Sequence, residues 1–273
     1  MPARLFQIAW SPQTLAGLDP GFEVIDNLAN PRPDWREYAP IRRFLLTQPL
    51  DEGTHYGFFS PRFGSKTGLS AATARRFVEG SDADVVGLSP FFDQMAFYRN
   101  IFVQAANQQP GLGPLLRQWC ARLTPGVDMD ALVMDSSDSI FCNYFAARPA
   151  FWREWLALGE QVWAAAENPA DPRAAGLNAA VAYDTQRAPA KVFLIERLVC
   201  LLLVREPGRW TVRTLDPTAL PYSAPETVPH APRLLAMDAL KRAWRASGHA
   251  AYLRAWEAMF DALAREAGRS VQP

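Results

Sequence analysis

The sequence predicts an α/β protein with a mixed sheet flanked by helices, followed by a mostly helical C-terminal part. Short apolar runs of β type alternate with amphipathic stretches in the first ninety residues. One run, DVVGL at residues 84–88, is apolar enough for a strand buried on both faces. This β–α–β–α–β order implies a sheet with helical connections. From Phe92 onward helical periodicity dominates.

In the first half each element has a local signal. Strands are expected where short apolar runs occur, at residues 5–10, 22–25, 56–59 and 84–88. A helix is expected at 35–46, where apolar residues recur at helical spacing and Asp34 could be the N-cap. A second helix is expected at 71–79, capped by Ser70.

The second half predicts longer helices and few strands. Helices are expected at residues 93–108, 114–123, 149–166 and 192–204, with one or two more within 236–267. Strands are expected at 139–147 and 210–215. Five prolines between 216 and 232 indicate an irregular linker. The expected domains are therefore an α/β domain at 1–215, a linker at 216–232 and a helical extension at 233–273.

Composition excludes several classes of protein. Hydrophobic residues make up 49% of the 273 residues and charged residues 21%, which is typical of a globular chain rather than a disordered one. Acidic and basic residues number 28 each, so no net charge attracts nucleic acid. The three cysteines show no disulfide or zinc spacing, which fits a reducing compartment. The most apolar segment, 192–204, contains Glu196 and Arg197 and is too short to span a bilayer. We expect a cytoplasmic protein without a transmembrane segment.

The loop SPRFGSKTGLS, at residues 60–70, is the leading candidate for a binding site. It follows the expected strand 56–59, and ligands in open α/β sheets bind beyond the carboxyl ends of strands. Arg62 and Lys66 could bind a diphosphate, while Gly64 and Gly68 would allow backbone N–H groups to approach it. The loop matches neither a P-loop nor a dinucleotide-binding fingerprint. The alternative is an ordinary surface loop with solvated cations.

Three further sets of polar residues are candidates. Asp93, Asn100 and Gln104 share one stripe of the expected helix 93–108, which suits either a polyol-binding cleft or a plain solvent face. Asp135, within VMDSSDSIFCNY, could act as a general base or serve only turn chemistry. Glu196, within an apolar run, could face a site or form a structural ion pair with Arg197.

No metal ligands are predicted. The pair Asp82 and Asp84 forms a D-x-D, but it precedes its strand, whereas sugar-nucleotide enzymes that bind Mg²⁺ or Mn²⁺ in this way carry the pair after the strand. No cofactor is therefore assigned, and Mg²⁺ or Mn²⁺ bound together with a nucleotide sugar remains an alternative.

Four segments, in this order, resemble a family of bacterial GT-A-like glycosyltransferases from cell-surface polysaccharide clusters. They are HYGFFSPRFGSKTGLS, SPFFDQMAFYRNIFVQA with its following PGL, VMDSSDSIFCNYFAARPAFWREWL and FLIERLVCLLL. Together they cover about residues 56–204. The resemblance implies a GT-A-like, Rossmann-like domain that binds a nucleotide sugar and glycosylates an acceptor. By that resemblance Ser60, Arg62 and Lys66 would lie near the donor, and Asn143 and Tyr144 would open the acceptor side. Tyr56 is counted with these substrate-binding residues.

The resulting hypothesis is a cytoplasmic glycosyltransferase that moves a sugar from a nucleotide-sugar donor to a glycan or other acceptor. Asp93, Asp135 and Glu196 are its candidate catalytic carboxylates. The alternative is a non-catalytic glycan- or partner-binding protein that retains the fold. The C-terminal helices could then dock a protein partner or a second copy of the chain.

Overall fold

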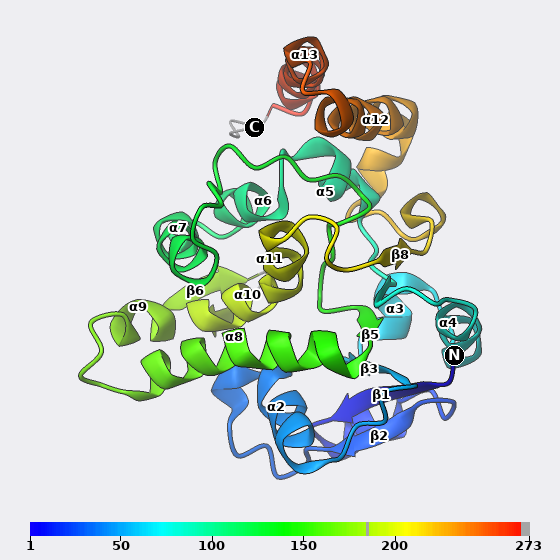
Figure 1. Cartoon of the computed structure of the whole chain (residues 1–273), viewed down its shortest axis with the longest axis vertical. Coiled ribbons are helices and arrows are strands. Elements are labelled where there is room, and N and C mark those ends of the chain that lie inside the picture. The colour runs from blue at the N-terminus through cyan, green and yellow to red at the C-terminus, as the bar shows by residue number, and fades with distance from the viewer. Residues whose placement is uncertain (184–185, 269–273) are drawn as a thin grey trace. The chain divides into compact units, whose positions relative to one another are not determined.

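The computed structural model describes residues 1–183 and 186–268 and divides into two compact units (Figure 1). The sheet unit comprises residues 1–89 and 140–215, and the helical unit comprises 90–139 and 216–273. Residues 90–139, which the sequence analysis placed in the α/β domain, thus group with the C-terminal helices. The chain enters the helical unit after strand β4, returns before β5 and leaves the sheet unit again after β8.

The sheet unit is built on a mixed six-stranded sheet in the order β2-β1-β3-β5-β4-β8. Neighbouring strands are parallel except where β5 pairs antiparallel with β3 and β4. The strands are β1 (Ala3–Ala9), β2 (Glu23–Asp26), β3 (His55–Phe59), β4 (Val85–Gly87), β5 (Phe145–Ala147) and β8 (Val212–Thr214). The α/β class expected from the sequence is confirmed.

The central strands are buried because helices cover the sheet. All residues of β3, β4 and β5 are buried, as near-continuous apolar strands require. One core cluster joins Leu5, Phe59 and Val86 from three strands to Ala74 of α4 (Ala71–Glu79). The burial of this cluster positions the carboxyl ends of β1 and β3.

Most of the other elements of the sheet unit are helices, of which α8 (Pro149–Glu167) is the longest. They are α1 (Pro12–Ala16), the 3₁₀ helix η1 (Pro33–Trp35), α2 (Tyr38–Thr47), α3 (Phe63–Thr67), α8, α9 (Ala174–Asn178), α10 (Ala190–Ile195) and α11 (Leu198–Arg205). Trp152 of α8 donates its indole N–H to the backbone oxygen of Tyr56, which fastens α8 to β3. A two-stranded antiparallel hairpin, β6 (Ala180–Tyr183) and β7 (Gln186–Pro189), precedes α10 and has no counterpart in the sequence prediction.

The described part of the helical unit contains helices and the loops between them, and no strand. The helices are α5 (Phe92–Phe97), α6 (Ile101–Gln108), α7 (Leu112–Leu123), η2 (Pro217–Ala219), η3 (Pro225–His230), α12 (Ala231–Ser247) and α13 (Ala250–Glu266). A separate core cluster joins Phe92 of α5 to Met237 of α12 and to Trp256 and Phe260 of α13. This shared core explains why residues 90–139 belong with the C-terminal helices. The expected linker at 216–232 contains the two 3₁₀ helices.

Several predicted elements match the structure closely. Ser70 caps α4 and accepts a hydrogen bond from the backbone N–H of Thr73, as predicted. Pro149 begins α8, where its missing N–H costs nothing. The expected pair of C-terminal helices is α12 and α13.

Other predicted elements are interrupted in the structure. The helix expected at 93–108 is two helices, α5 and α6, because Asn100 is extended and caps α6 by accepting from the N–H groups of Phe102 and Val103. The helix expected at 192–204 is likewise divided into α10 and α11 at Glu196 and Arg197.

Three further predictions were wrong in detail. The strand expected at 139–147 is reduced to β5, because Cys142 and Asn143 have positive φ angles of 61° and 55°. Asp34 does not cap a helix; it lies within η1 and pairs with Arg32 and Lys191. The loop at 60–70 contains the short helix α3, which ends at Gly68 in the left-handed conformation.

No helix within the described residues is both long enough and apolar enough to cross a bilayer.

Candidate functional site

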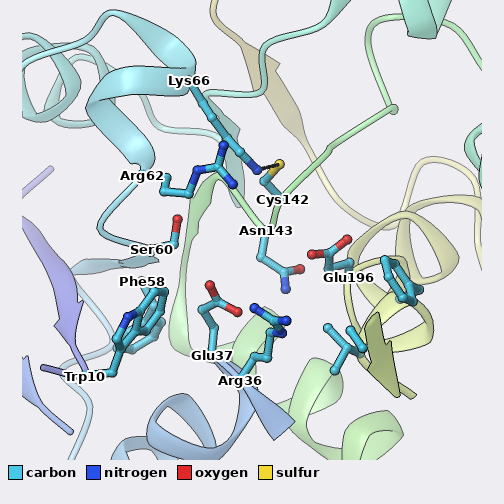
Figure 2. Close-up of a pocket in the computed structure, with 13 residues that line it drawn as sticks. Trp10, Arg36, Glu37, Phe58, Ser60, Arg62, Lys66, Cys142, Asn143 and Glu196 are labelled. Atoms are coloured by element: carbon cyan, nitrogen blue, oxygen red, sulfur yellow. Dashed lines mark hydrogen bonds between the residues drawn. The ribbon is translucent and has the colours of Figure 1, made fainter. Parts of the chain in front are cut away.

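A pocket in the sheet unit lies at the carboxyl ends of β1 and β3 (Figure 2). Trp10 follows β1 directly, and Ser60 follows β3 directly. β2 and β3 both pair parallel with β1 and lie on opposite sides of it, although they follow β1 in chain order. The direction of the connections therefore reverses here, and the carboxyl ends of β1 and β3 form a topological switch point of the sheet. Ligands of open α/β sheets bind at such points. The cavity volume is about 80 Å³.

Three cationic side chains line the pocket: Arg36, Arg62 and Lys66. Arg62 and Lys66 come from the segment around α3, as the sequence predicted, and Arg36 comes from the turn after η1. The guanidinium groups of Arg36 and Arg62 form no hydrogen bond or ion pair with any residue that the structure describes. Lys66 donates to the Cys142 thiol at 3.2 Å, and its Nζ lies 5.9 Å from the centre of the Tyr144 ring. Arg36 and Arg62 therefore offer positive charge that no described carboxylate neutralises through an ion pair.

Two carboxyl groups face the same pocket: Glu37 and Glu196. Burial raises the pKa of the Glu37 carboxyl, and repulsion from Glu196 adds to the increase, while the charges of Arg36 and Lys66 oppose it. Glu196 forms an ion pair of 3.3 Å with the buried Arg197 and keeps 32% of its side chain exposed. Thus Glu196 both pairs with Arg197 and faces the site.

Asn143 presents a buried amide to the pocket. Its exposed fraction is 6%, and its Oδ1 has no hydrogen-bond partner. Figure 2 shows the amide directed into the space between Glu37 and Glu196. A buried acceptor without a partner is costly, so this atom marks where a ligand donor would bind.

Backbone strain is concentrated around this pocket. Five non-glycine residues with positive φ are found among the described residues, and three of them line the pocket: Arg36, Cys142 and Asn143. Arg36 has φ 44° and ψ −128°, a conformation that ordinarily requires glycine. Such strain persists when the surrounding structure holds it, and it is characteristic of functional sites.

Of the predicted residues Ser60, Tyr144 and Tyr56, only Ser60 lines the pocket. The hydroxyls of Ser60 and Tyr144 share a 2.7 Å hydrogen bond, and burial raises the Tyr144 pKa above its ordinary value. The Tyr144 ring does not line the pocket, but it contacts Lys66, which does. Tyr56 is buried in β3, and its hydroxyl accepts from the backbone N–H of Asp51.

The structure places the amide stripe of the sequence prediction in the helical unit. Asp93 is 1% exposed and accepts from the backbone N–H and the hydroxyl of Ser223. Asn100 donates to the backbone oxygens of Met129 and Leu132 and accepts two N–H groups of α6, so all of its amide atoms have internal partners. Gln104 donates to Gln94 at 3.3 Å, while its Oε1 is buried without a partner.

Asp135 also lies in the helical unit. Its side chain is 4% exposed, and it pairs with Arg245 at 2.6 Å and Arg242 at 3.4 Å. Hydrogen bonds from Ser137 and the charge of Arg245 lower the Asp135 pKa despite the opposing effect of burial. Among the predicted catalytic carboxylates, only Glu196 lines the pocket of the sheet unit.

The pocket carries two carboxyl groups as candidate ligands for a divalent metal ion. Mg²⁺ and Ca²⁺ prefer clusters of oxygen ligands, but Glu37 and Glu196 lie among three cationic side chains. The described residues contain no cluster of three or more His, Cys, Asp or Glu side chains that could bind a metal. Asp84 lies before β4, where it accepts from the N–H and hydroxyl of Thr211.

Sequence reasoning missed Trp10, Arg36 and Glu37. Trp10 could have been found, because it follows the carboxyl end of β1 just as Ser60 follows β3. Arg36 and Glu37 gave no such signal, since they fall inside the stretch expected to be one helix at 35–46. Their position depends on the strained turn between η1 and α2.

Comparison with protein-family models, with curated proteins and with solved structures gives no match.

Proposed function

We propose that the pocket of the sheet unit binds the diphosphate of a nucleotide sugar and that the chain transfers this sugar to a glycan or another acceptor. The observation that carries the proposal is the pair of unneutralised arginines, Arg36 and Arg62, beside Lys66 at the carboxyl ends of β1 and β3. Guanidinium groups bind phosphate oxygens in a two-pronged geometry, and free ones at a switch point favour a phosphorylated ligand. The mixed sheet agrees with the GT-A-like fold that the resemblance implies.

Four pocket residues then have a role in the transfer. Arg62 and Lys66 stabilise the negative charge that develops on the departing diphosphate, which preorganised cations can do without a metal ion. Glu196 is the candidate base that accepts the proton of the acceptor hydroxyl, because it is the predicted carboxylate that lines the pocket. Ser60 is held by Tyr144 and orients a donor hydroxyl toward the ligand.

The cavity volume favours a second candidate function, binding without catalysis. About 80 Å³ is far below the roughly 300–1,000 Å³ of sites that enclose a whole ligand. Only the diphosphate or part of the sugar would enter, and the nucleoside would lie at the rim. A glycan- or partner-binding protein would need no more room than this.

Binding of nucleoside diphosphates tests the first proposal. Isothermal titration calorimetry with UDP, GDP and dTDP, and with CMP, should identify one nucleotide that binds. Arg62→Ala and Lys66→Ala should each weaken it about tenfold or more, because each removes a charge-assisted hydrogen bond. Arg76→Ala is the matched control, since Arg76 is an exposed arginine of α4 that does not line the pocket. Equal affinity in all three variants would refute the assignment.

Transfer separates the two candidate functions. Glu196→Gln should still bind the nucleotide. It should no longer release nucleoside diphosphate from a nucleotide sugar when the acceptor is present. Binding without any turnover in the wild-type protein would favour the non-catalytic function.

A further inference from the structure

We infer that the pocket selects a sugar phosphate that carries a primary ammonium group. It should prefer this amino sugar to the sugar with a hydroxyl or an N-acetyl group at the same position. The inference rests on the proposed function and specifies its substrate class. Arg62 and Lys66 supply anion-binding groups, and Glu37, Asn143 and Glu196 supply hydrogen-bond acceptors, with Arg36 beside Glu37 and Asn143 (Figure 2).

The Asn143 amide is the first reason. Its Oδ1 is buried, has no partner and is directed into the pocket (Figure 2). Two consecutive residues with positive φ, Cys142 and Asn143, hold it there. The chain thus maintains a strained turn to present an acceptor that nothing in the described chain satisfies.

The carboxyl groups are the second reason. The Glu37 side chain receives no hydrogen bond or ion pair from another residue in the described ranges. Arg36 and Lys66 act on it only through space, and Glu196 repels it. Figure 2 shows Asn143 and Glu196 directed toward one another, so acceptor oxygens approach from both sides. A half-buried carboxylate without a paired cation is unfavourable, so the group either keeps its proton or pairs with a cation that the ligand brings.

An ammonium group satisfies all three acceptors at once. It carries a positive charge and three N–H donors on a compact centre, whereas a hydroxyl carries one donor and no charge. An N-acetyl group removes the charge and leaves a single N–H donor. The phosphate of the same ligand would lie on Arg62 and Lys66.

Three sugar phosphates that differ in one substituent test the inference. Affinities of glucosamine 1-phosphate, glucose 1-phosphate and N-acetylglucosamine 1-phosphate are measured by calorimetry at pH 7. The amino form should bind at least about tenfold more tightly than either counterpart, the size of effect expected when a charged hydrogen bond is gained. Equal affinities, or no binding by any of the three, would overturn the inference.

Variants show whether these residues cause the selectivity. Asn143→Asp keeps the shape and tolerates positive φ, and it should raise the preference for the amino form because it adds a negative charge. Glu37→Gln and Glu196→Gln should lower the preference, and Glu79→Gln, an exposed glutamate of α4, should leave it unchanged. The affinity ratio of two ligands within one variant does not depend on the folded fraction. A lower preference in Asn143→Asp would contradict the assignment.

The two proposals fail in different ways. If the proposed function holds but the ammonium site does not, nucleoside diphosphates bind and the three sugar phosphates bind with equal affinity. No nucleotide binds, yet the amino sugar phosphate is preferred, if the ammonium site is real and the nucleotide-sugar function is wrong.

Discussion

Replacing Arg36 with glycine should stabilise the protein and weaken ligand binding together. Arg36 occupies φ 44° and ψ −128°, where a side chain with a Cβ atom is strained and glycine is not. Its guanidinium has no ion pair or hydrogen bond in the described ranges, so its removal breaks neither kind of contact there. Relief of the strain is opposed by the loss of the favourable effect of the Arg36 charge on Glu37, a loss that Arg36→Ala shares.

The size of the effect follows from the backbone conformation. A residue in a sparsely populated region costs about 1–3 kcal/mol. The glycine itself lowers the free energy of unfolding by about 0.4–1 kcal/mol, because it increases the conformational entropy of the unfolded chain. The net gain is about 1 kcal/mol, which for a chain of this length corresponds to a rise in Tm of roughly 2–4 °C.

The assay compares Arg36→Gly with Arg36→Ala by urea unfolding and calorimetry. Both variants lose the charge, so both should bind a nucleoside diphosphate about tenfold more weakly. Only the glycine variant loses the strain, so it should be the more stable of the two. Asn30→Gly, at φ 36° away from the pocket, should leave binding unchanged. Equal stability of the Gly and Ala variants would refute the reasoning.

Two further predictions concern the same unit. Gly159→Ala in α8 should destabilise by about 1–3 kcal/mol, because its Cβ would overlap the buried Tyr38 ring, 2.7 Å from Cε2. Gly64→Ala is the control, because its Cβ would meet only the backbone oxygen of Leu69 at 3.8 Å, an ordinary contact. Comparable unfolding midpoints for the two variants would contradict the packing argument. Glu37→Gln should gain stability relative to the wild type as the pH rises above about 4.5: burial raises the Glu37 pKa, so its contribution is full below that pH and is lost as the pH rises through the folded pKa. A stability difference that stays constant between pH 4.5 and 8 would exclude this account.

Local signals sufficed where one residue or one short run decides the structure. The strands β1, β3 and β4 are apolar runs, and the cap Ser70 and the first-turn Pro149 are fixed by their own chemistry. Arg62 and Lys66 were found for a similar reason. A cationic loop after a strand must lie at the carboxyl edge of the sheet.

Tertiary packing decided what the sequence left open. Residues 90–139 join the C-terminal helices because the core of α5 is completed by Met237 and Trp256, far along the chain. The expected strand 139–147 gives way to a left-handed turn at Cys142 and Asn143, a conformation that no local preference of Cys favours.

The sequence by itself determined the α/β class, the strands β1, β3 and β4 and the cationic loop, because each depends on neighbours in the chain. Only the tertiary structure decided that Arg36, Glu37, Asn143 and Glu196 meet in one pocket while Asp93 and Asp135 do not. That meeting depends on strained turns and on contacts across more than a hundred residues, where the energy of the whole fold outweighs local preference.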